Sequence, residues 1–279
     1  MTTTSHTSQH QGQHDKATLF HSLHHGAASP LLLANAWDVA SALVVEEAGA
    51  TAVATTSAGV AWSLGSPDGD ALDRDRAVGL IARVAAAVKV PVTADIEGGF
   101  AETAEGVGET VAKVIEAGAV GVNLEDGTRD PAAQADRIAA ARAAADKAGI
   151  PLYLNARIDM YLFGLGEESD RLAETIRRMR SYVAAGASGI FVPGTTDPET
   201  VAALVAAVDV PLNLLVGPGD PSVAELAKLG VARLSLGSSV ASAAYGAARR
   251  ATRELLERGT YDAVTDAVPY GELNALFPR

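Results

Sequence analysis

The 279-residue sequence contains no cysteine, which excludes disulfide bonds, thiolate zinc sites and a cysteine acting as nucleophile or acid. Aromatic residues are scarce at 5%, so a core must be packed from aliphatic side chains and alanine. No apolar run reaches the length of a membrane span, and the N-terminal residues lack the apolar region of a secretory signal. We therefore expect a cytoplasmic protein with no membrane partner.

Basic residues are in the minority, because 22 Lys and Arg residues stand against 34 Asp and Glu residues, for a formal net charge of −12. Such a field repels polyanions, so we expect no nucleic-acid partner. A small anionic substrate would need a local cation or an arginine to overcome this repulsion. Hydrophobic residues make up 48% of the chain, which is enough to build a sizeable core.

The N-terminal stretch is polar and lacks a hydrophobic period. We expect a disordered tail over residues 1–25, followed by a single domain over residues 26–279. His6, His10 and His14 are spaced four residues apart, so metal binding by the tail is an alternative.

From residue 30 onward, short apolar runs alternate with stretches of helical spacing, and several of these stretches end in glycine before the next run. Continuous apolar runs are typical of parallel strands covered on both faces. Eight strand–helix units predict a closed (β/α)8 barrel, with a doubly wound open sheet as the alternative. An extra helical segment follows the last run. The eight runs are 30–35, 51–56, 90–95, 119–124, 151–156, 188–193, 210–215 and 231–236.

Charged side chains occur where successive apolar runs end. Asp95 and Glu97 lie at the end of the third run, Glu125 follows the fourth, and Arg157 follows the fifth. In a parallel barrel these ends meet on one face, where active sites lie. Magnesium typically takes one or two carboxylates and several waters, so we predict a Mg²⁺ site at the three acids. We expect Arg157 to clamp a substrate carboxylate, or to pair with a neighbouring acid for structure alone.

Residues 55–70 form the longest stretch without a helical pattern. The backbone N–H groups of Thr56, Ser57 and Ala58 are predicted to cradle an anion. Asp68 lies on the same loop and is a candidate catalytic residue. The alternative is a turn aspartate, because Pro-Asp-Gly is a strong turn signature.

Further polar residues have both a functional and a structural interpretation. Asn213 lies inside an apolar run and is predicted to bind substrate at the barrel mouth, unless it is a hydrogen-bonded core residue. Asn35 or Asp38 is expected to cap the first helix after the first run. Asp126 and Asp159 are alternative caps for the helices that follow them.

Five motifs, in this order, resemble the isocitrate lyase and phosphoenolpyruvate mutase superfamily: NAWDVASALVVEEAG, TTSAGVAWSLGSPDGD, ADIEGGF, GVNLEDG and NARID. The resemblance covers residues 30–258 and implies an (α/β)8 barrel using magnesium on 2-oxo acids or phosphonates. It also implies dimers or tetramers that exchange the last helix. It assigns Thr56, Ser57, Ala58 and Arg157 to the substrate, and it assigns Asp68, Asp95, Glu97 and Glu125 to the metal or its water shell.

One departure from this pattern bears on the reaction. Lyases of the superfamily carry a lid with lysine, cysteine, glycine and histidine after the acid that matches Glu125, and the lid supplies their general acid. Here only residues 126–130 separate Glu125 from Pro131, so this lid is missing. Water exclusion and reprotonation must then come from elsewhere.

The favoured hypothesis is a magnesium-dependent lyase or decarboxylase that cleaves a C–C bond next to a small 2-oxo acid through a pyruvate enolate. In it, Glu125, Arg157 and Asp68 are the catalytic residues. Decarboxylation of oxaloacetate suits the missing lid best, because carbon dioxide leaves without a proton. Cleavage or rearrangement of the C–P bond of phosphonopyruvate is the alternative. A barrel that binds a 2-oxo acid without turnover is a third hypothesis.

Overall fold

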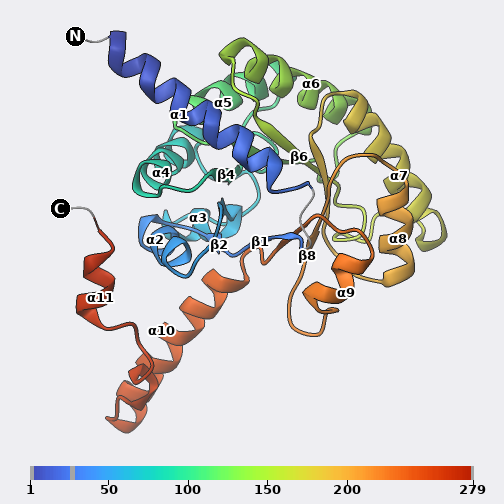
Figure 1. Ribbon diagram of the computed structural model, residues 1–279. Coiled ribbons are helices and arrows are strands. Elements are labelled where there is room, and N and C mark those ends of the chain that lie inside the picture. The colour runs from blue at the N-terminus through green and yellow to red at the C-terminus, as the bar shows by residue number, and fades with distance from the viewer. Residues whose placement is uncertain (1–2, 26–28, 278–279) are drawn as a thin grey trace.

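The computed structural model describes residues 3–25 and 29–277, with side chains described from residue 10. Parallel strands form a barrel that helices surround (Figure 1). The strands are β1 (Leu31–Leu33), β2 (Asn35–Ala36), β3 (Val53–Thr55), β4 (Val92–Asp95), β5 (Gly121–Glu125), β6 (Tyr153–Arg157), β7 (Gly189–Val192), β8 (Leu212–Leu215) and β9 (Arg233–Ser235).

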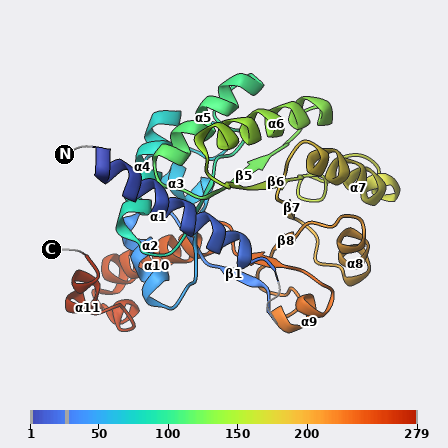
Figure 2. The same cartoon turned by 45° about the horizontal axis from the view of Figure 1, so that its top comes forward.

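Helices follow most strands and cover the outside of the barrel, as the tilted view in Figure 2 shows. They are α1 (Thr3–Ser22), α2 (Val39–Glu47), α3 (Ser57–Ser63), α4 (Arg74–Ala87), α5 (Ala104–Glu116), α6 (Pro131–Ala148), α7 (Glu168–Ala184), α8 (Pro198–Ala206), α9 (Val223–Lys228), α10 (Ser239–Arg258) and α11 (Tyr270–Ala275), with a 3₁₀ helix η1 (Asp262–Val264).

The barrel closes through the first predicted strand, which the structure splits into β1 and β2. All pairings are parallel, and the hydrogen-bonded order is β1-β9-β8-β7-β6-β5-β4-β3-β2. Leu33 of β1 pairs with Ser235 of β9, whereas Asn35 of β2 pairs with Ala54 of β3. The chain around Ala34 therefore joins the two ends of the sheet. This confirms the predicted TIM-type barrel, and the ninth strand is half of a predicted one.

The strands form where predicted because helices cover their outer faces. Every residue of β7 is buried, as are the first four residues of β5 and of β6. Helix ends follow local rules as well: Asp38 caps α2 by accepting from Ser41 N at 2.7 Å, and Asp130 caps α6 just before Pro131. Asp38, not Asn35, is thus the predicted cap of the first helix after the first run.

The stretch expected to be free of helix contains α3, so that prediction is wrong. Thr56 is its N-cap residue, and Ser57 and Ala58 form its first turn. A close fit explains the helix, because a Cβ on Gly59 would lie only 2.7 Å from Trp37 Cβ. Such a contact between distant segments leaves no periodic signal in a short run of small residues.

The disordered tail predicted for residues 1–25 is also wrong, because Thr3–Ser22 forms α1. This helix crosses one end of the barrel (Figures 1 and 2). Phe20 is fully buried there, and a Cβ on Gly121, the first residue of β5, would approach its ring to 2.8 Å. Gln13 Nε2 donates to Ile115 O at 2.7 Å. Tertiary contacts stabilise a helix whose polar sequence gives it little amphipathic character.

The metal-binding alternative for the N-terminal histidines finds no support in the described side chains. His10 Nε2 lies 3.1 Å from Ala148 O, and His6 falls outside the described side chains. Among the described residues, no group of three His, Cys, Asp or Glu is placed to hold a metal ion.

Below α1, His24 is buried between the helix and the barrel. Its ring stacks on Tyr153 with 3.9 Å between centroids, and its Nδ1 lies 2.7 Å from Phe20 O. Burial, with a smaller contribution from the guanidinium of Arg233, lowers the pKa of His24 from 6.5 to about 3. The neutral form is therefore the one that the fold accommodates.

This arrangement predicts acid sensitivity that depends on His24. Because the pKa is lower in the folded state, the unfolded chain binds more protons between pH 6.5 and about 3, and stability falls as the pH drops through that window. The slope from this residue approaches about 1.4 kcal/mol per pH unit. Urea unfolding at several pH values should show a shallower loss for His24→Phe than for the wild type. Parallel curves for the two proteins would contradict the prediction.

The C-terminal segment extends away from the barrel as α10, η1 and α11 (Figure 1). We call residues 239–277 the C-terminal arm. Ala241 is the one buried residue of α10, whereas Leu256 is 79% exposed and Tyr270 is 85% exposed. None of the helices in the described ranges is long and apolar enough to cross a membrane.

Candidate active site

The carboxyl ends of β4, β5 and β6 bring the predicted acids and the predicted arginine together. Asp95 is the last residue of β4, Glu125 the last of β5 and Arg157 the last of β6, and Glu125 pairs directly with Arg157 in the sheet register. Asp95 N donates to Thr55 Oγ1 at 2.9 Å, and Asn123 Nδ2 donates to Asp95 Oδ2 at 3.3 Å. The parallel register places these side chains on one face of the barrel.

Glu97 follows β4 in a left-handed conformation, with a φ of 51°, and is 2% exposed. Its Oε2 accepts from Gly69 N at 3.1 Å and from Asp70 N. Asp70 in turn accepts from Gly98 N at 3.1 Å and pairs with Arg129 Nη2 at 2.7 Å. The loop after α3 is therefore tied to the ends of β4 and β5 through Glu97, Asp70 and Arg129.

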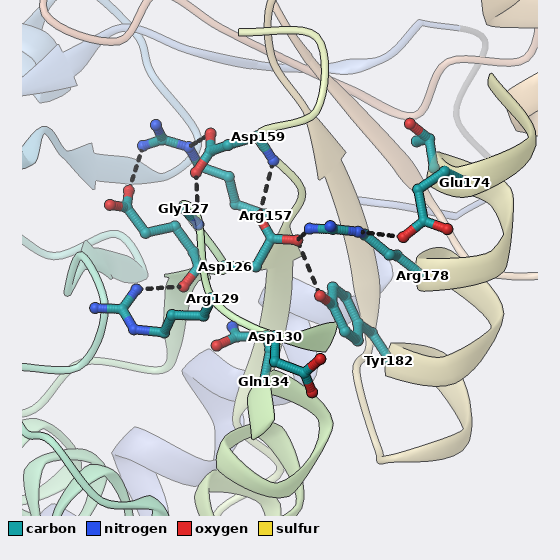
Figure 3. Close-up of polar contacts among 12 residues, drawn as sticks. Asp126, Gly127, Arg129, Asp130, Gln134, Arg157, Asp159, Glu174, Arg178 and Tyr182 are labelled. Carbon is teal, nitrogen blue, oxygen red and sulfur yellow. Dashed lines mark hydrogen bonds and ion pairs between the residues drawn. The ribbon is translucent and has the colours of Figure 1, made fainter. Parts of the chain in front are cut away.

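Arg157 lies between two carboxylates (Figure 3). Its Nη1 is 2.6 Å from Glu125 Oε2, and its Nε is 2.7 Å from Asp159 Oδ1. The side chain is 14% exposed, whereas that of Asp159 is fully buried. A guanidinium carries five N–H donors, so donors remain for a ligand. The structural pairing and the predicted substrate contact of Arg157 are thus compatible.

The acids at this face are harder to ionise than free carboxyl groups. Burial raises the pKa of Glu97 to about 7, and the charges of Asp95 and Asp68 add to the shift. Burial also raises the pKa of Glu125 to about 8, although the nearby guanidinium of Arg157 acts in the opposite direction. The pKa of Asp95 is raised chiefly by burial as well. Each ionised carboxylate here makes ionisation of its neighbours less favourable, and a bound cation would offset this repulsion.

The residues present fit magnesium better than any thiolate-binding metal. The candidate ligands Asp95, Glu97 and Glu125 at the ends of β4 and β5 offer oxygen atoms only, and magnesium usually keeps several waters alongside one or two carboxylates. The described part of the chain holds no ready-made cluster of three metal-binding side chains. The arrangement of Asp95, Glu97 and Glu125 therefore suits an ion held largely through water rather than a cage made only of protein.

The other residues predicted to bind substrate or to act in catalysis differ in their exposure and in their hydrogen-bond partners. Thr56 N already donates to Ala36 O at 3.1 Å, so its N–H cannot join an anion cradle, whereas Ser57 and Ala58 lie in the first turn of α3, where N–H groups lack intrahelical acceptors. Asp68 is exposed on the loop before α4. Asn213 is buried, and its Nδ2 has no hydrogen-bond partner. The anion cradle is thus corrected to two residues at most.

Two residues predicted as possible helix caps have other partners. Asp126 and Asp159 are both fully buried, and neither caps a helix. Asp159 Oδ2 accepts from Gly127 N at 3.1 Å, and Asp126 pairs with Arg178 at 2.7 Å. These interpretations of Asp126 and Asp159 as caps are therefore wrong, because Asp130 caps α6 and Glu167 occupies the N-cap position of α7.

Sequence reasoning missed polar residues inside the barrel. Arg233 is 1% exposed and donates from Nη2 to Asn123 Oδ1 at 3.2 Å, and Asn155 Nδ2 donates to the same oxygen at 2.9 Å. Asn123 thereby connects Asp95 to the barrel interior. The polar positions within the apolar runs 119–124, 151–156 and 231–236 were the available signal.

Space remains on both sides of the barrel mouth. A hollow of about 1090 Å³ lies beside the Asp70–Arg129 pair, lined also by Phe100 and Arg137. A smaller one of about 340 Å³ lies past the ends of β7 and β8, lined by Gly194, Thr195, Thr196, Leu215, Val216, Gly217, Asp220 and Ser239. The second hollow continues the face on which Arg157 and Asn213 lie, because β7 pairs with both β6 and β8.

Known proteins are similar to this chain in sequence or in structure. An uncharacterized protein of Mycobacterium tuberculosis is 40% identical over 261 residues, which cover 92% of this chain and 95% of the relative. A solved structure from Burkholderia cenocepacia is 42% identical with a TM-score of 0.82, covering 86% of this chain and 99% of that one. An oxaloacetate decarboxylase of Ectopseudomonas mendocina is 33% identical over 200 residues, covering 69% and 67%.

The family model described as phosphoenolpyruvate phosphomutase matches residues 20–256. This range contains all the strands and every acid and arginine at their carboxyl ends. The chain therefore belongs to the phosphoenolpyruvate phosphomutase family, within the superfamily that also includes isocitrate lyase.

Proposed function

We propose that this protein is a magnesium-dependent lyase or decarboxylase that cleaves a C–C bond next to a small 2-oxo acid and yields a pyruvate enolate. The observation that carries the proposal is the convergence of Arg157 with Asp95, Glu97 and Glu125 at the ends of three adjacent strands. Members of this superfamily include C–C lyases and mutases, and the relative from E. mendocina is named for oxaloacetate decarboxylation.

The chain's own residues would bind and orient the substrate. Arg157 would hold a carboxylate or a developing oxyanion with the donors that Glu125 and Asp159 leave available. Asn213 Nδ2, which lacks a partner, would donate to a second substrate oxygen. Magnesium, held by Asp95, Glu97 and Glu125, would supply positive charge that stabilises the enolate. Asp68 would lie over the same face from the exposed loop.

The short connection after β5 favours decarboxylation among the possible reactions. Only residues 126–130 join β5 to α6, and the chain has no cysteine. In oxaloacetate decarboxylation, the bond to the departing carboxylate breaks, carbon dioxide leaves, and the electron pair becomes the enolate of pyruvate. That step requires no proton for the leaving group, so it does not depend on a general acid from a lid.

C–P chemistry on phosphonopyruvate is the second candidate, because the matching family model is described as a phosphomutase. The same enolate-stabilising groups would serve either reaction. The products separate the two: phosphoenolpyruvate or free phosphate indicates C–P chemistry, whereas carbon dioxide and pyruvate indicate decarboxylation. A barrel that binds a 2-oxo acid without converting it would give neither set of products.

The test is a product screen combined with a binding measurement. The full chain would be incubated with oxaloacetate, other 2-oxo diacids or phosphonopyruvate, with and without magnesium, and a protein-free magnesium control would measure background decay. Oxalate, a stable mimic of the pyruvate enolate, would be titrated by calorimetry against the wild type and Glu125→Ala. We expect magnesium-dependent oxalate binding that is lost in the variant, and turnover of at least one 2-oxo acid.

Each other outcome has a defined meaning. Oxalate binding without any conversion would support the non-catalytic barrel. Identical behaviour of the wild type and Glu125→Ala, with no 2-oxo acid converted, would overturn the proposal.

We further propose that the C-terminal arm packs on a second copy of the chain, as the family resemblance implies. Leu255 and Leu256 on α10, Tyr261 before η1 and Tyr270 on α11 are 58–85% exposed. A surface with this many large apolar side chains is typical of a protein–protein contact. Exchange of α10 between subunits would bury it.

If the C-terminal arm packs on a second copy of the chain, charged substitutions in it should change the oligomeric state. Leu255→Asp together with Leu256→Asp should convert a dimer or tetramer into monomers, because two charges would be buried in the contact. Sedimentation velocity on both proteins measures the change, and far-ultraviolet circular dichroism checks that the barrel remains folded. A monomeric wild type at micromolar concentration would contradict this prediction.

A further inference from the structure

The side chain of Arg157 is held by a chain of buried contacts that extends to α7. Its first member is Asp159, whose Oδ1 accepts from Arg157 Nε at 2.7 Å and whose Oδ2 accepts from Gly127 N at 3.1 Å. The backbone N–H of Asp159 donates to Asp126 Oδ1 at 2.9 Å. Both carboxylates are fully buried, so water does not compete for these contacts.

The second part of this series of contacts is made by residues of α7 (Figure 3). Asp126 Oδ2 accepts from Arg178 Nη1 at 2.7 Å and from Tyr182 OH at 2.9 Å. Arg178 Nε in turn donates to Glu174 Oε1 at 2.9 Å. The polar contacts therefore run without interruption from the surface of α7 to the end of β6.

Holding the fold together does not by itself require these groups. Burying charges costs solvation free energy, and apolar side chains of similar volume often serve a core equally well. Here each oxygen of the buried Asp126 and Asp159 carboxylates has a partner, and the contacts end on the guanidinium of Arg157, the last residue of β6. Because Asp159 engages Nε and Glu125 engages Nη1, the plane of the Arg157 guanidinium is set from two sides.

We propose that Asp126, Asp159, Arg178 and Tyr182 are positioning residues that set the orientation of the Arg157 guanidinium toward the barrel mouth. Their effect on substrate rests on the proposed function, but their effect on Arg157 does not. A small misplacement of a binding group strongly reduces its contribution to substrate binding and turnover. A substitution on α7 should therefore alter the position of the Arg157 guanidinium and its contribution to binding.

Arg177 provides a matched control for Arg178. It is the preceding residue on α7 and pairs with the same Glu174 at 2.7 Å, but its side chain is 60% exposed and pairs with Glu174 rather than with Asp126. Arg178→Gln and Arg177→Gln therefore make the same chemical change at neighbouring positions. Tyr182→Phe is a gentler variant that removes one hydrogen bond from Asp126 and keeps the aromatic ring.

The experiment measures hydrogen exchange of the Arg157 Nε–H by NMR on arginine-labelled protein, with the signal assigned by its loss in Arg157→Lys. Magnesium-dependent oxalate binding is measured on the same samples. Arg178→Gln should speed exchange and weaken oxalate binding by about tenfold, and Tyr182→Phe should act in the same direction by about threefold, as expected for lost hydrogen bonds. Arg177→Gln should change neither quantity.

The outcomes separate this inference from the proposed function. A folded Tyr182→Phe with wild-type exchange at Arg157, or equal effects of the Arg177 and Arg178 variants, would overturn the inference. A loss of thermal stability without any change at the Arg157 Nε–H would indicate a purely structural role and would also overturn it. Absence of oxalate binding in the wild type would contradict the proposed function, while the exchange data would still decide the positioning role.

Discussion

Replacing Arg157 with methionine is expected to lower turnover of the best 2-oxo acid by about 100- to 1000-fold, the usual cost of removing one donor to a developing oxyanion. The reason is geometric, because the guanidinium is oriented by contacts of 2.6 and 2.7 Å with Glu125 and Asp159. Arg157→Lys should rescue little, since an ammonium cannot reproduce a planar fork of donors. Steady-state kinetics and oxalate calorimetry measure both effects.

A control at an exposed arginine distinguishes loss of the site from a general effect of charge. Arg180 is exposed on α7, so Arg180→Met should leave turnover within about twofold of the wild type, as expected for a surface substitution. Turnover of Arg157→Met at the wild-type rate would remove the proposed role of this residue. A decrease in both variants would point instead to the net charge of the protein.

Removing the Asp126 carboxylate is expected to cause the largest loss of stability among the substitutions considered. Asp126→Ala would remove the carboxylate that faces Arg178 Nη1, leaving Glu174 as the remaining carboxylate partner of Arg178, and would leave Tyr182 OH without an acceptor. Breaking one side of a buried ion pair typically costs about 3–5 kcal/mol. The free energy of unfolding, measured by urea denaturation near neutral pH, should fall by that amount.

Asp146→Ala is the matched surface control for this measurement. Asp146 also pairs with an arginine, Arg142, but at 3.9 Å and with a side chain that is 68% exposed. Exposed pairs contribute less than about 1 kcal/mol, so the control should remain close to the wild type. Equal losses in the two variants would show that burial does not set the contribution of Asp126.

The barrel was predictable because its signals are local. Each strand is a short apolar run, and helices such as α6 begin at a capping aspartate followed by proline. Parallel strands within one sheet must align their carboxyl ends, so the acids and the arginine that end these runs were expected on one face. The structure confirms that alignment in the pairing of Glu125 with Arg157.

The two helices that the sequence did not predict, α1 and α3, are stabilised by tertiary contacts and carry no local sequence signal. Helix α1 is held by a few buried side chains near its end, such as Phe20, and by hydrogen bonds from Gln13 to the last turn of α5 and to the connection that follows it. Helix α3 packs through small residues against Trp37 and α10. Neither segment carries an apolar period of its own, so neither was predicted as a helix.

Apart from α1 and α3, the sequence by itself determined the alternation of strands and helices and the charged residues at the strand ends, because periodicity and capping depend on near neighbours. Only the tertiary structure decided which of those charges are partners. Asp70 meets Arg129, and Asp126 meets Arg178, across 59 and 52 residues of chain. Such pairings depend on the register of the closed barrel and on how α7 packs against it, which no local pattern encodes.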